Sequence, residues 1–426
     1  MKRVLVCFVA FAISALFLLQ SRATGKPDTL EAPREALGAA LLAHDLAAVE
    51  VAVEWGRKVL GDQAGVPEVA DEYLPVPSSA RLLSADEVRL SVKKTFAHLQ
   101  RLKTWRIGLD PTKLAAPLRA PAGVVAGMVA IHRAKLDDGR TALREATEAA
   151  DFLIWAQEQA GAGCYPFPAA RNTSQERAMQ VATRFLERAE AAGKLGETVR
   201  NGWAYEDHGD GGMQFDNGEC GVAIFELFEV TQDQRYLDSA LKAADWALKR
   251  PLCPNWNYNS FSVNLLAKAH QVTKHPKYLQ AALEKALLGV VPGQLTSGPR
   301  AGRWMDPHNA RPAYHYIMMT ALARLASELP KGHTDLPKVL QSIKLGLSAR
   351  NGEILGQGVM NKDKPVECLN LVQHLFAHDT AFLTETTTGE ALDTIQRLAS
   401  EEARHGKFPL GPRGWGELLE RCARQD

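Results

Sequence analysis

Apolar residues recur at three- and four-residue intervals along most of this chain, which predicts an almost entirely helical protein. Between residues 30 and 60, for example, Leu37, Leu41 and Val49 follow helical spacing. No run alternates in the way a half-buried strand would, so strand content is expected to be minor. The same spacing predicts further helices within residues 88–102, 122–135, 141–159, 174–192, 221–230, 236–248, 260–272, 276–290, 312–329, 336–347, 364–378 and 389–404.

A repeat is visible in the middle of the chain. Tyr236-Leu237 and Ala240-Leu241 recur 42 residues later as Tyr278-Leu279 and Ala282-Leu283. A looser similarity relates Ala149-Ala150-Asp151 to Ala243-Ala244-Asp245. Each unit is a helix, a short turn, a second helix and a longer connection. A helical hairpin cannot bury its apolar face alone, so the hairpins are expected to stack.

The long connections hold nearly all the aromatic and ionisable residues that fall outside helices. Three stretches stand out, namely Trp203–Glu226, Asn255–Asn264 and Arg303–Tyr316. The first combines many carboxylates with many glycines, a composition that predicts a loop rather than a core. Because each stretch comes just before a predicted helix, we expect these three loops to line one site.

The hairpins between about residues 120 and 350, with the segment GDGGMQFDNGECG that opens a helix, resemble the α/α-toroid enzymes called six-hairpin glycosidases and their polysaccharide-lyase relatives. No particular family within that group is matched. The resemblance implies an all-α toroid of stacked hairpins, formed by residues 24–426 as a single catalytic domain. It also implies a substrate cleft at the end that carries the long loops. Gly411–Gly416 is expected to cover the toroid or to seal its closure.

The N-terminus has the features of a secretory signal peptide. Lys2-Arg3 precedes the apolar run Val4–Leu19, and Ser21-Arg22-Ala23 supplies a small-x-small cleavage site. We therefore expect residues 1–23 to be removed and the protein to be secreted or periplasmic. An uncleaved membrane anchor is the alternative, because the run is close to the length of a membrane span.

Composition excludes several classes of protein. A formal net charge of +1 argues against nucleic acid as a partner. Beyond Cys7, the five cysteines are widely separated and form no CxxC pair, which argues against a disulfide scaffold. Most are expected to be core residues, and one disulfide remains open. The sequence contains no P-loop, GxSxG or HExxH motif.

The carboxylates of the first loop predict hydrolysis of a glycosidic bond, which requires one carboxylic acid and one carboxylate. Asp207, Asp210 and Asp216 are the candidate catalytic residues, joined by His308 from the third loop. Glu219 belongs to the same acidic cluster. The alternative is that these carboxylates cap the following helix at Asp216 or Asn217. Glu226 and Glu229 are as consistent with a solvated helix face.

The second and third loops also suit a uronate lyase, which needs a neutraliser for the substrate carboxylate, a base and an acid. Asn259, His308, Arg311 and Tyr314 supply these types. Flat aromatic rings and amides further predict saccharide binding. Together the expected substrate-binding residues are Trp203, Tyr205, Trp256, Asn257, Tyr258, Asn259, Trp304, Arg311, Tyr314 and His315, for each of which core packing is the alternative.

No cofactor is expected, although Asp207, His208 and Asp210 could hold Ca²⁺ without an EF-hand spacing. The sequence therefore predicts an exported enzyme that hydrolyses an oligo- or polysaccharide. A polysaccharide lyase, a sugar epimerase and a non-catalytic helical-repeat binding protein remain as alternatives.

Overall fold

The computed structural model describes seven segments of the chain. They are residues 30–67, 73–102, 118–137, 140–169, 177–207, 211–306 and 309–424. The predicted signal peptide lies outside these segments, as do His208, Asp210 and His308.

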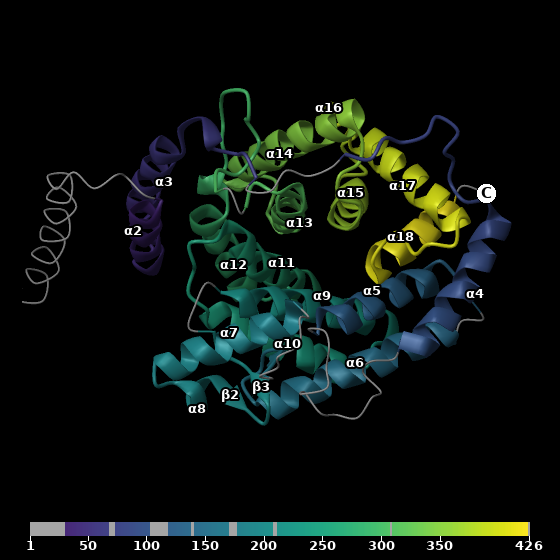
Figure 1. Ribbon diagram of the computed structural model, residues 1–426, viewed down its shortest axis with the longest axis horizontal. Coiled ribbons are helices and arrows are strands. Elements are labelled where there is room, and N and C mark those ends of the chain that lie inside the picture. The colour runs from purple at the N-terminus through teal and green to yellow at the C-terminus, as the bar shows by residue number, and fades with distance from the viewer. Residues whose placement is uncertain are drawn as a thin grey trace, which may run out of the picture.

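Six inner helices form a closed ring (Figure 1). Each inner helix packs against the next inner helix along the chain, and the last inner helix packs against the first. In order they are α5 (Arg119–Arg133), α9 (Gly212–Thr231), α11 (Trp256–Thr273), α13 (Pro312–Glu328), α15 (Asp363–Leu375) and α18 (Pro412–Ala423).

An outer helix packs against each inner helix. In the same order the outer helices are α6 (Thr141–Ala160), α10 (Gln234–Lys249), α12 (Pro276–Gly289), α14 (Leu336–Gln357), α17 (Thr388–Arg404) and α4 (Ala85–Leu102). The predicted all-α toroid of stacked hairpins is therefore confirmed. Helix α4, the first of these twelve helices in the chain, pairs with α18, the last, and so completes the outer layer of the ring.

The remaining elements surround the toroid. A hairpin of α2 (Glu31–Leu42) and α3 (Leu46–Leu60) lies outside the ring, at the left of Figure 1. The connection between α6 and α9 contains α7 (Arg177–Ala191), α8 (Leu195–Thr198) and a small antiparallel sheet. Short elements elsewhere are η2 (Gly61–Gln63), η5 (Val291–Gly293) and α16 (Thr380–Glu385).

Strand content is minor in the described residues, as predicted. The sheet has the order β1-β3-β2 and consists of β1 (Phe167–Pro168), β2 (Val199–Arg200) and β3 (Trp203–Ala204). Among the helices described, none is long and apolar enough to cross a membrane.

The sequence repeat corresponds to a repeated contact between outer helices. The Tyr236 hydroxyl of α10 donates to Asp151 of α6 at 3.3 Å, and the Tyr278 hydroxyl of α12 donates to Asp245 of α10 at 2.9 Å. The two aspartates are the ones that the looser similarity relates. The hairpins that contain α10 and α12 are thus each joined to the previous one by the same tyrosine–aspartate pair, which explains why these residues recur.

A second repeated contact fixes the inner helices α9 and α11 to the segments packed around them. The Asn217 amide accepts from Tyr165 N at 3.1 Å and donates to Ala243 O at 3.0 Å. Asn259, 42 residues later, accepts from Cys253 N at 3.0 Å and donates to Gly289 O at 2.9 Å. Both side chains are buried. Buried amides whose groups are all paired specify one packing arrangement.

The C-terminal helix seals the ring, as one of the two expectations for Gly411–Gly416 stated. A Cβ atom added at Gly127 of α5 would lie 2.0 Å from the Pro412 carbonyl oxygen, and one at Gly416 of α18 would lie 2.2 Å from the Gly127 carbonyl oxygen. Glycine is therefore required at both positions, because the two backbones are in direct contact.

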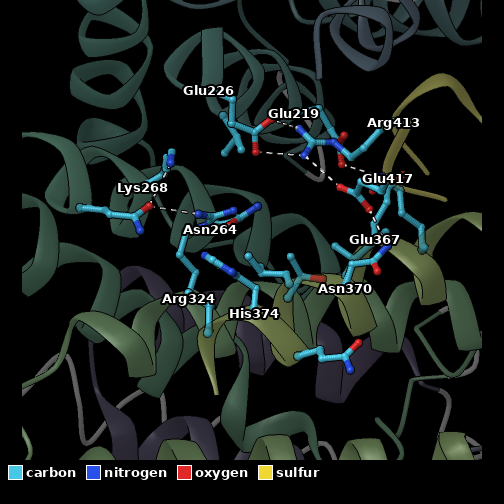
Figure 2. A pocket seen from close by; sticks show the side chains of 18 of the residues that line it. Glu219, Glu226, Asn264, Lys268, Arg324, Glu367, Asn370, His374, Arg413 and Glu417 are labelled. Atoms are coloured by element: carbon cyan, nitrogen blue, oxygen red, sulfur yellow. Dashed lines mark hydrogen bonds and ion pairs between the residues drawn. The ribbon is translucent and has the colours of Figure 1, made fainter. Parts of the chain in front are cut away.

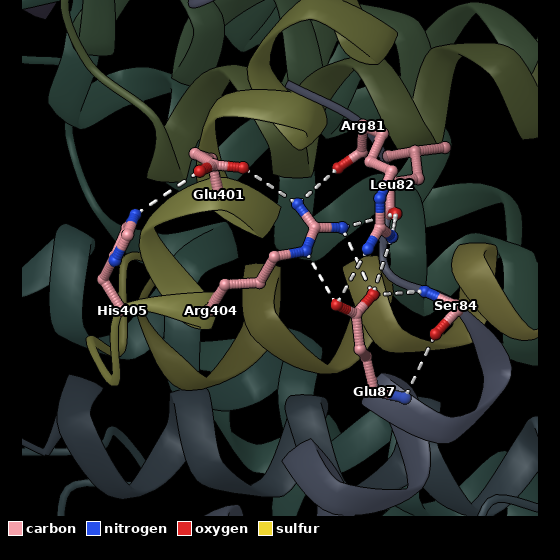
Figure 3. Close-up of polar contacts among 7 residues, drawn as sticks. All are labelled: Arg81, Leu82, Ser84, Glu87, Glu401, Arg404 and His405. Carbon is pink, nitrogen blue, oxygen red and sulfur yellow. Dashed lines mark hydrogen bonds and ion pairs between the residues drawn. The ribbon is translucent and has the colours of Figure 1, made fainter. Parts of the chain in front are cut away.

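Helix α4 is held in place at its N-terminus (Figure 3). Ser84 and Glu87 form a capping box, with Ser84 N donating to Glu87 at 2.8 Å and Glu87 N donating to the Ser84 hydroxyl at 3.4 Å. Arg404 of α17 also donates to Glu87, at 2.8 Å from Nε. These hydrogen bonds, from Arg404 above all, hold the pKa of Glu87 well below its usual range. The outer helix that completes the ring is thus anchored to its neighbour.

Three helix boundaries differ markedly from prediction, and one helix of the ring was not predicted. Helix α9 begins at Gly212 rather than at residue 221, α11 begins at Trp256, α14 extends to Gln357, and α18 was not predicted. In α9 the glycines allow close helix packing: a Cβ atom at Gly218 would lie 2.8 Å from the Phe261 Cβ and carbonyl oxygen. The glycine-rich segment is therefore mostly helix, and the prediction that it forms a loop was wrong. The N-cap is Gly211, with a φ of 84°, and not Asp216 or Asn217.

Candidate functional site

The bore of the ring contains a cavity of about 740 Å³ (Figure 2). This volume is within the range of small-molecule sites in proteins. Its lining comes from the inner helices and runs from the middle of α9, α11 and α13 to their C-terminal turns. Residues near those ends, such as His374 and Arg424, are exposed, whereas Phe261 at the other end is buried. The cavity therefore opens where the short turns lie.

Seven basic and six acidic side chains line the cavity among the described residues. The basic ones are Arg133, Lys268, Arg324, Lys364, Arg413, Arg421 and Arg424, and the acidic ones are Glu219, Glu226, Glu229, Glu367, Glu417 and Glu420.

One pair of carboxylates shares a lysine. The Lys364 ammonium lies 2.9 Å from Glu219 and 2.8 Å from Glu367. Burial raises the pKa of Glu367 above its ordinary value, since Lys364 offsets only part of the desolvation. For Glu219, burial has the same direction, but Lys364 and Arg413 outweigh it and lower the pKa. The cation thus keeps one partner ionised while the other holds its proton more tightly.

A second pair shares an arginine. Arg413 contacts Glu226 through both terminal nitrogens, at 3.0 and 2.9 Å, and its Nη1 lies 3.9 Å from Glu417. Asn370 donates to the other Glu417 oxygen at 3.1 Å. Glu226 comes from α9, Glu417 and Arg413 from α18, and Asn370 from α15, so closure of the ring brings them together.

The environments of Glu226 and Glu417 shift their pKa values in opposite directions. Burial alone would raise the pKa of Glu226, but Arg413, with help from Lys268 and Arg324, lowers it to about 2. Burial raises the pKa of Glu417 to about 8, because Arg413 is more distant and compensates little. Near neutral pH the cavity therefore contains a carboxylate and a carboxylic acid beside one guanidinium. This division of roles is what acid–base chemistry requires.

The three predicted loops do meet. Gln214 Nε2 donates to Pro251 O at 3.3 Å, and the Ser262 hydroxyl donates to the Gln214 amide at 2.5 Å, which joins the first and second stretches. Asn257 N donates to Asn309 Oδ1 at 3.2 Å, which joins the second and third. These contacts lie at the N-terminal ends of the inner helices, the end opposite the mouth of the cavity.

Of the predicted catalytic residues, Asp207 and Asp216 are described, and they make separate contacts. Asp207 is buried, accepts from Met213 N at 3.0 Å and lies 3.7 Å from Arg250. Asp216 is buried and accepts from Arg119 Nε at 3.1 Å. Burial raises the pKa of Asp216, with Arg119 acting against the shift. Asp210 and His308 lie outside the described residues.

The predicted binding aromatics are mostly core residues. Trp203, Trp256 and Trp304 are at most 1% exposed, so they offer no ring face to a ligand in this structure. Tyr205 and Tyr258 are partly buried. Trp304 is held by its indole N–H, which donates to Val290 O at 2.8 Å. For the tryptophans, packing is the role that this geometry supports.

Five further predicted residues also lie at the loop end. His315 is fully buried between Trp304 N and Arg350 Nε, and burial lowers its pKa well below the usual range. Asn259 is the structural amide described above. Asn257 Oδ1 and Arg311 Nε are buried atoms without a hydrogen-bond partner. The remaining one, Tyr314, is partly buried with the Arg311 guanidinium 6.0 Å from its ring.

Glu219 of the predicted acidic cluster lines the bore cavity, whereas none of the predicted catalytic and substrate-binding residues in the described part of the chain does. The residues that do line it follow helical spacing, as in Lys364, Glu367, Leu371 and His374 of α15. A polar stripe at this spacing usually marks a solvated helix face. Since these helices are otherwise apolar, the stripe was a signal that could have indicated an enclosed polar channel.

Cys164, Cys220, Cys253, Cys368 and Cys422 are all buried and form no disulfide, which confirms that they are core residues. Within the seven described segments, no three His, Cys, Asp or Glu side chains gather as ligands of one ion.

Comparison with known proteins gives structural likenesses alone. No family model and no curated protein matches the sequence. A polysaccharide lyase structure has a TM-score of 0.49 and 13% identity, over 80% of this chain and 97% of its own. A family 88 glycosyl hydrolase from Bacteroides vulgatus has a TM-score of 0.49 and 12% identity, over 80% and 99%. An unsaturated glucuronyl hydrolase specific for heparin has a TM-score of 0.30 and 13% identity, over 75% and 99%. At this identity the likenesses assign no activity.

Proposed function

We propose that this protein is a carbohydrate-active enzyme that hydrolyses a glycosidic bond in the bore of its toroid, with Glu417 as the acid and Glu226 as the carboxylate partner. The single observation that carries the proposal is their placement: both face one cavity and both contact Arg413, at 3.9 and 2.9 Å.

The chemistry follows from this pair. The Glu417 carboxylic acid gives its proton to the glycosidic oxygen as the bond from that oxygen to the anomeric carbon breaks. The ionised Glu226 either takes a proton from the attacking water or attacks the anomeric carbon itself. In the second case water then releases the sugar from Glu226. Arg413 keeps Glu226 ionised throughout.

The cavity suits a saccharide in other respects. Its lining combines charged groups with the amides Asn264, Gln271 and Asn370. Amides and charged groups provide both donors and acceptors to sugar hydroxyls. A volume of about 740 Å³ has room for a short oligosaccharide rather than for a long chain lying along a surface.

Export is part of the same proposal, on the strength of Lys2-Arg3, the apolar run and the cleavage site at the N-terminus. Export would give the enzyme access to saccharides outside the cytoplasm. N-terminal sequencing of the protein recovered from its native host tests it. A mature chain that begins near Thr24 supports export, and retention of Met1 or Lys2 contradicts cleavage.

A second candidate function, lyase action at the loop end, is favoured by one observation. Asn257 Oδ1 and Arg311 Nε lie buried there without hydrogen-bond partners, and unpaired buried groups are costly unless a ligand satisfies them. The Arg311 guanidinium suits the neutralisation of a uronate carboxylate, and the Asn257 amide oxygen can accept from a sugar hydroxyl.

One experiment separates the two functions. Purified protein is incubated with neutral and uronate-containing saccharides while ultraviolet absorbance and reducing ends are followed. Hydrolysis releases reducing ends without an absorbance gain, whereas β-elimination creates an absorbing unsaturated uronate. A gain in absorbance matching the ends released would reject hydrolysis in the bore.

A further inference from the structure

We propose that Arg324 is an anion-binding residue of the bore, which takes the carboxylate or sulfate group of an acidic saccharide. The inference rests on the proposed function for the ligand being a saccharide, and it assigns that ligand a chemical class. Arg324 belongs to α13, is 5% exposed and lines the cavity. Within the described residues it makes no hydrogen bond or ion pair with the Glu226–Arg413–Glu417 group that carries the proposed chemistry, although its charge helps to lower the pKa of Glu226.

The partners of Arg324 are neutral. Its Nε donates to Asn264 Oδ1 at 2.7 Å, and its Nη1 donates to Gln271 Oε1 at 3.3 Å. Both amides come from the neighbouring helix α11. They fix the plane of the guanidinium without forming an ion pair, and the carboxylates that act on its charge, Glu226 first, do so without direct contact. A guanidinium has five N–H donors, so donors remain for a ligand.

Every other basic side chain in the lining has a carboxylate nearby. Arg413 and Lys364 hold the two pairs described above, and Lys268 and Arg133 contact Glu229 at 2.5 and 3.0 Å. The remaining two, at the mouth, pair with Glu420 and Asp393. Within the described residues, Arg324 has no carboxylate within 4.0 Å. It is the exception in a lining that otherwise neutralises each charge.

An uncompensated buried charge is unfavourable, and a pairing anion removes the penalty. Burial accordingly lowers the pKa of Arg324. Its fork geometry matches the two oxygens of a carboxylate or sulfate better than a single hydroxyl. Gln271 also accepts from Lys268 at 3.0 Å, so a second cation lies on the same side of the amide. Direct contact with the Arg324 guanidinium therefore favours an anionic group over a neutral one.

Binding is measured by calorimetry with the full chain, independently of turnover, using D-glucuronate, glucosamine 6-sulfate, D-glucose and inorganic sulfate. The wild type is expected to bind the two acidic sugars about tenfold or more tightly than glucose, since a hydrogen bond to a charged group contributes about 1.5–3 kcal/mol. Equal affinity for glucuronate and glucose overturns the proposal. Tighter binding of inorganic sulfate than of either acidic sugar overturns its saccharide part.

Three variants test the residue itself. Arg324→Gln should abolish the preference for acidic sugars, whereas Arg397→Gln removes the same charge from outer helix α17 and should leave it unchanged. Asn264→Asp places a carboxylate on Arg324 Nε, so it should fold with an internal ion pair and also abolish the preference. This variant decides the matter if Arg324→Gln fails to fold. A preference retained in Asn264→Asp overturns the proposal.

Glu417→Gln separates this inference from the proposed function. The variant should lose hydrolysis but keep the preference for acidic sugars. A wild type that prefers acidic sugars yet hydrolyses none of the substrates contradicts the proposed function and leaves the anion site supported. Hydrolysis without any preference for acidic sugars supports the proposed function and contradicts the anion site.

Discussion

Arg413 contacts Glu226 through both of its terminal nitrogens, at 3.0 and 2.9 Å. The two residues come from α18 and α9, which lie on opposite sides of α5 in the ring. The contact therefore exists only once the ring has closed. Glu417 lies one helical turn beyond Arg413 and shares the same guanidinium. The same three residues therefore hold the closed ring together and form the candidate catalytic group.

The pH dependence of activity should report the two carboxyl groups. Hydrolysis requires Glu417 with its proton and Glu226 without it, so activity should fall as pH rises through the Glu417 pKa of about 8. The acidic limb should lie far lower, because the pKa of Glu226 is about 2. A profile of kcat/KM against pH in the free enzyme measures both. An alkaline limb unchanged in the residual activity of Glu417→Gln would contradict the assignment.

Stability should depend on pH through Glu417 in a defined direction. Its pKa is about 8 in the folded protein against an ordinary value of 4.5, so the folded state binds the proton more tightly. The stabilisation is complete below about pH 4.5 and is lost as pH rises toward 8. Each unit of difference is worth about 1.4 kcal/mol. Thermal unfolding at several pH values should show this decline, and Glu417→Gln should flatten it.

Glu226 should behave in the opposite sense. Its folded pKa is lowered to about 2, so its contribution is present above about pH 4.5 and is lost as pH falls. Glu226→Gln should destabilise the protein at neutral pH by about 3–5 kcal/mol, because Arg413 would remain buried without its closest partner. Denaturant unfolding measures the change. A loss below about 1 kcal/mol would show that the ion pair does not hold the ring closed.

The glycine contact between α5 and α18 should tolerate no side chain. Gly416→Ala places a Cβ atom 2.2 Å from the Gly127 carbonyl oxygen, so α18 must move away. We expect a loss of about 1–3 kcal/mol or more from overpacking. The matched control is Gly352→Ala in α14, where no heavy atom lies within 4 Å and the change should stabilise by about 0.5–1 kcal/mol. Equal melting temperatures for the two variants would contradict this packing.

Asn217 and Asn259 should give matching results because they occupy equivalent places in successive hairpins. Removal of either amide leaves buried backbone groups unpaired, at about 1–3 kcal/mol for each group. Alanine at either position should therefore lower stability by a similar amount. At the lowest temperatures, where Asn259→Ala remains folded, its activity should approach that of the wild type. A large loss of kcat without loss of stability would contradict the structural role and support the prediction that Asn259 binds substrate.

The architecture was predictable because helical spacing and the 42-residue repeat both report on hairpins. The start of α9 was not predictable, since glycine-rich, acidic sequence normally indicates a loop. Only the structure shows why this helix has glycine at position 218, where Phe261 packs directly against its backbone. The cavity residues appear in the sequence only as polar stripes along otherwise apolar helices. Glu226 and Glu229 follow the spacing of a solvated face, and the sequence does not tell whether such a face meets solvent or the inside of a ring.

The central claim concerns which carboxylates act. The most direct test is the initial rate of reducing-end release from one hydrolysed saccharide by the wild type, Glu417→Gln and Asp216→Asn, each first shown to be folded. Glu417→Gln should lose about 10²–10⁴-fold, the usual contribution of a general acid, while Asp216→Asn should remain within about tenfold of the wild type. A large loss in Asp216→Asn together with wild-type rates in Glu417→Gln would place the chemistry at the loop end and contradict the bore.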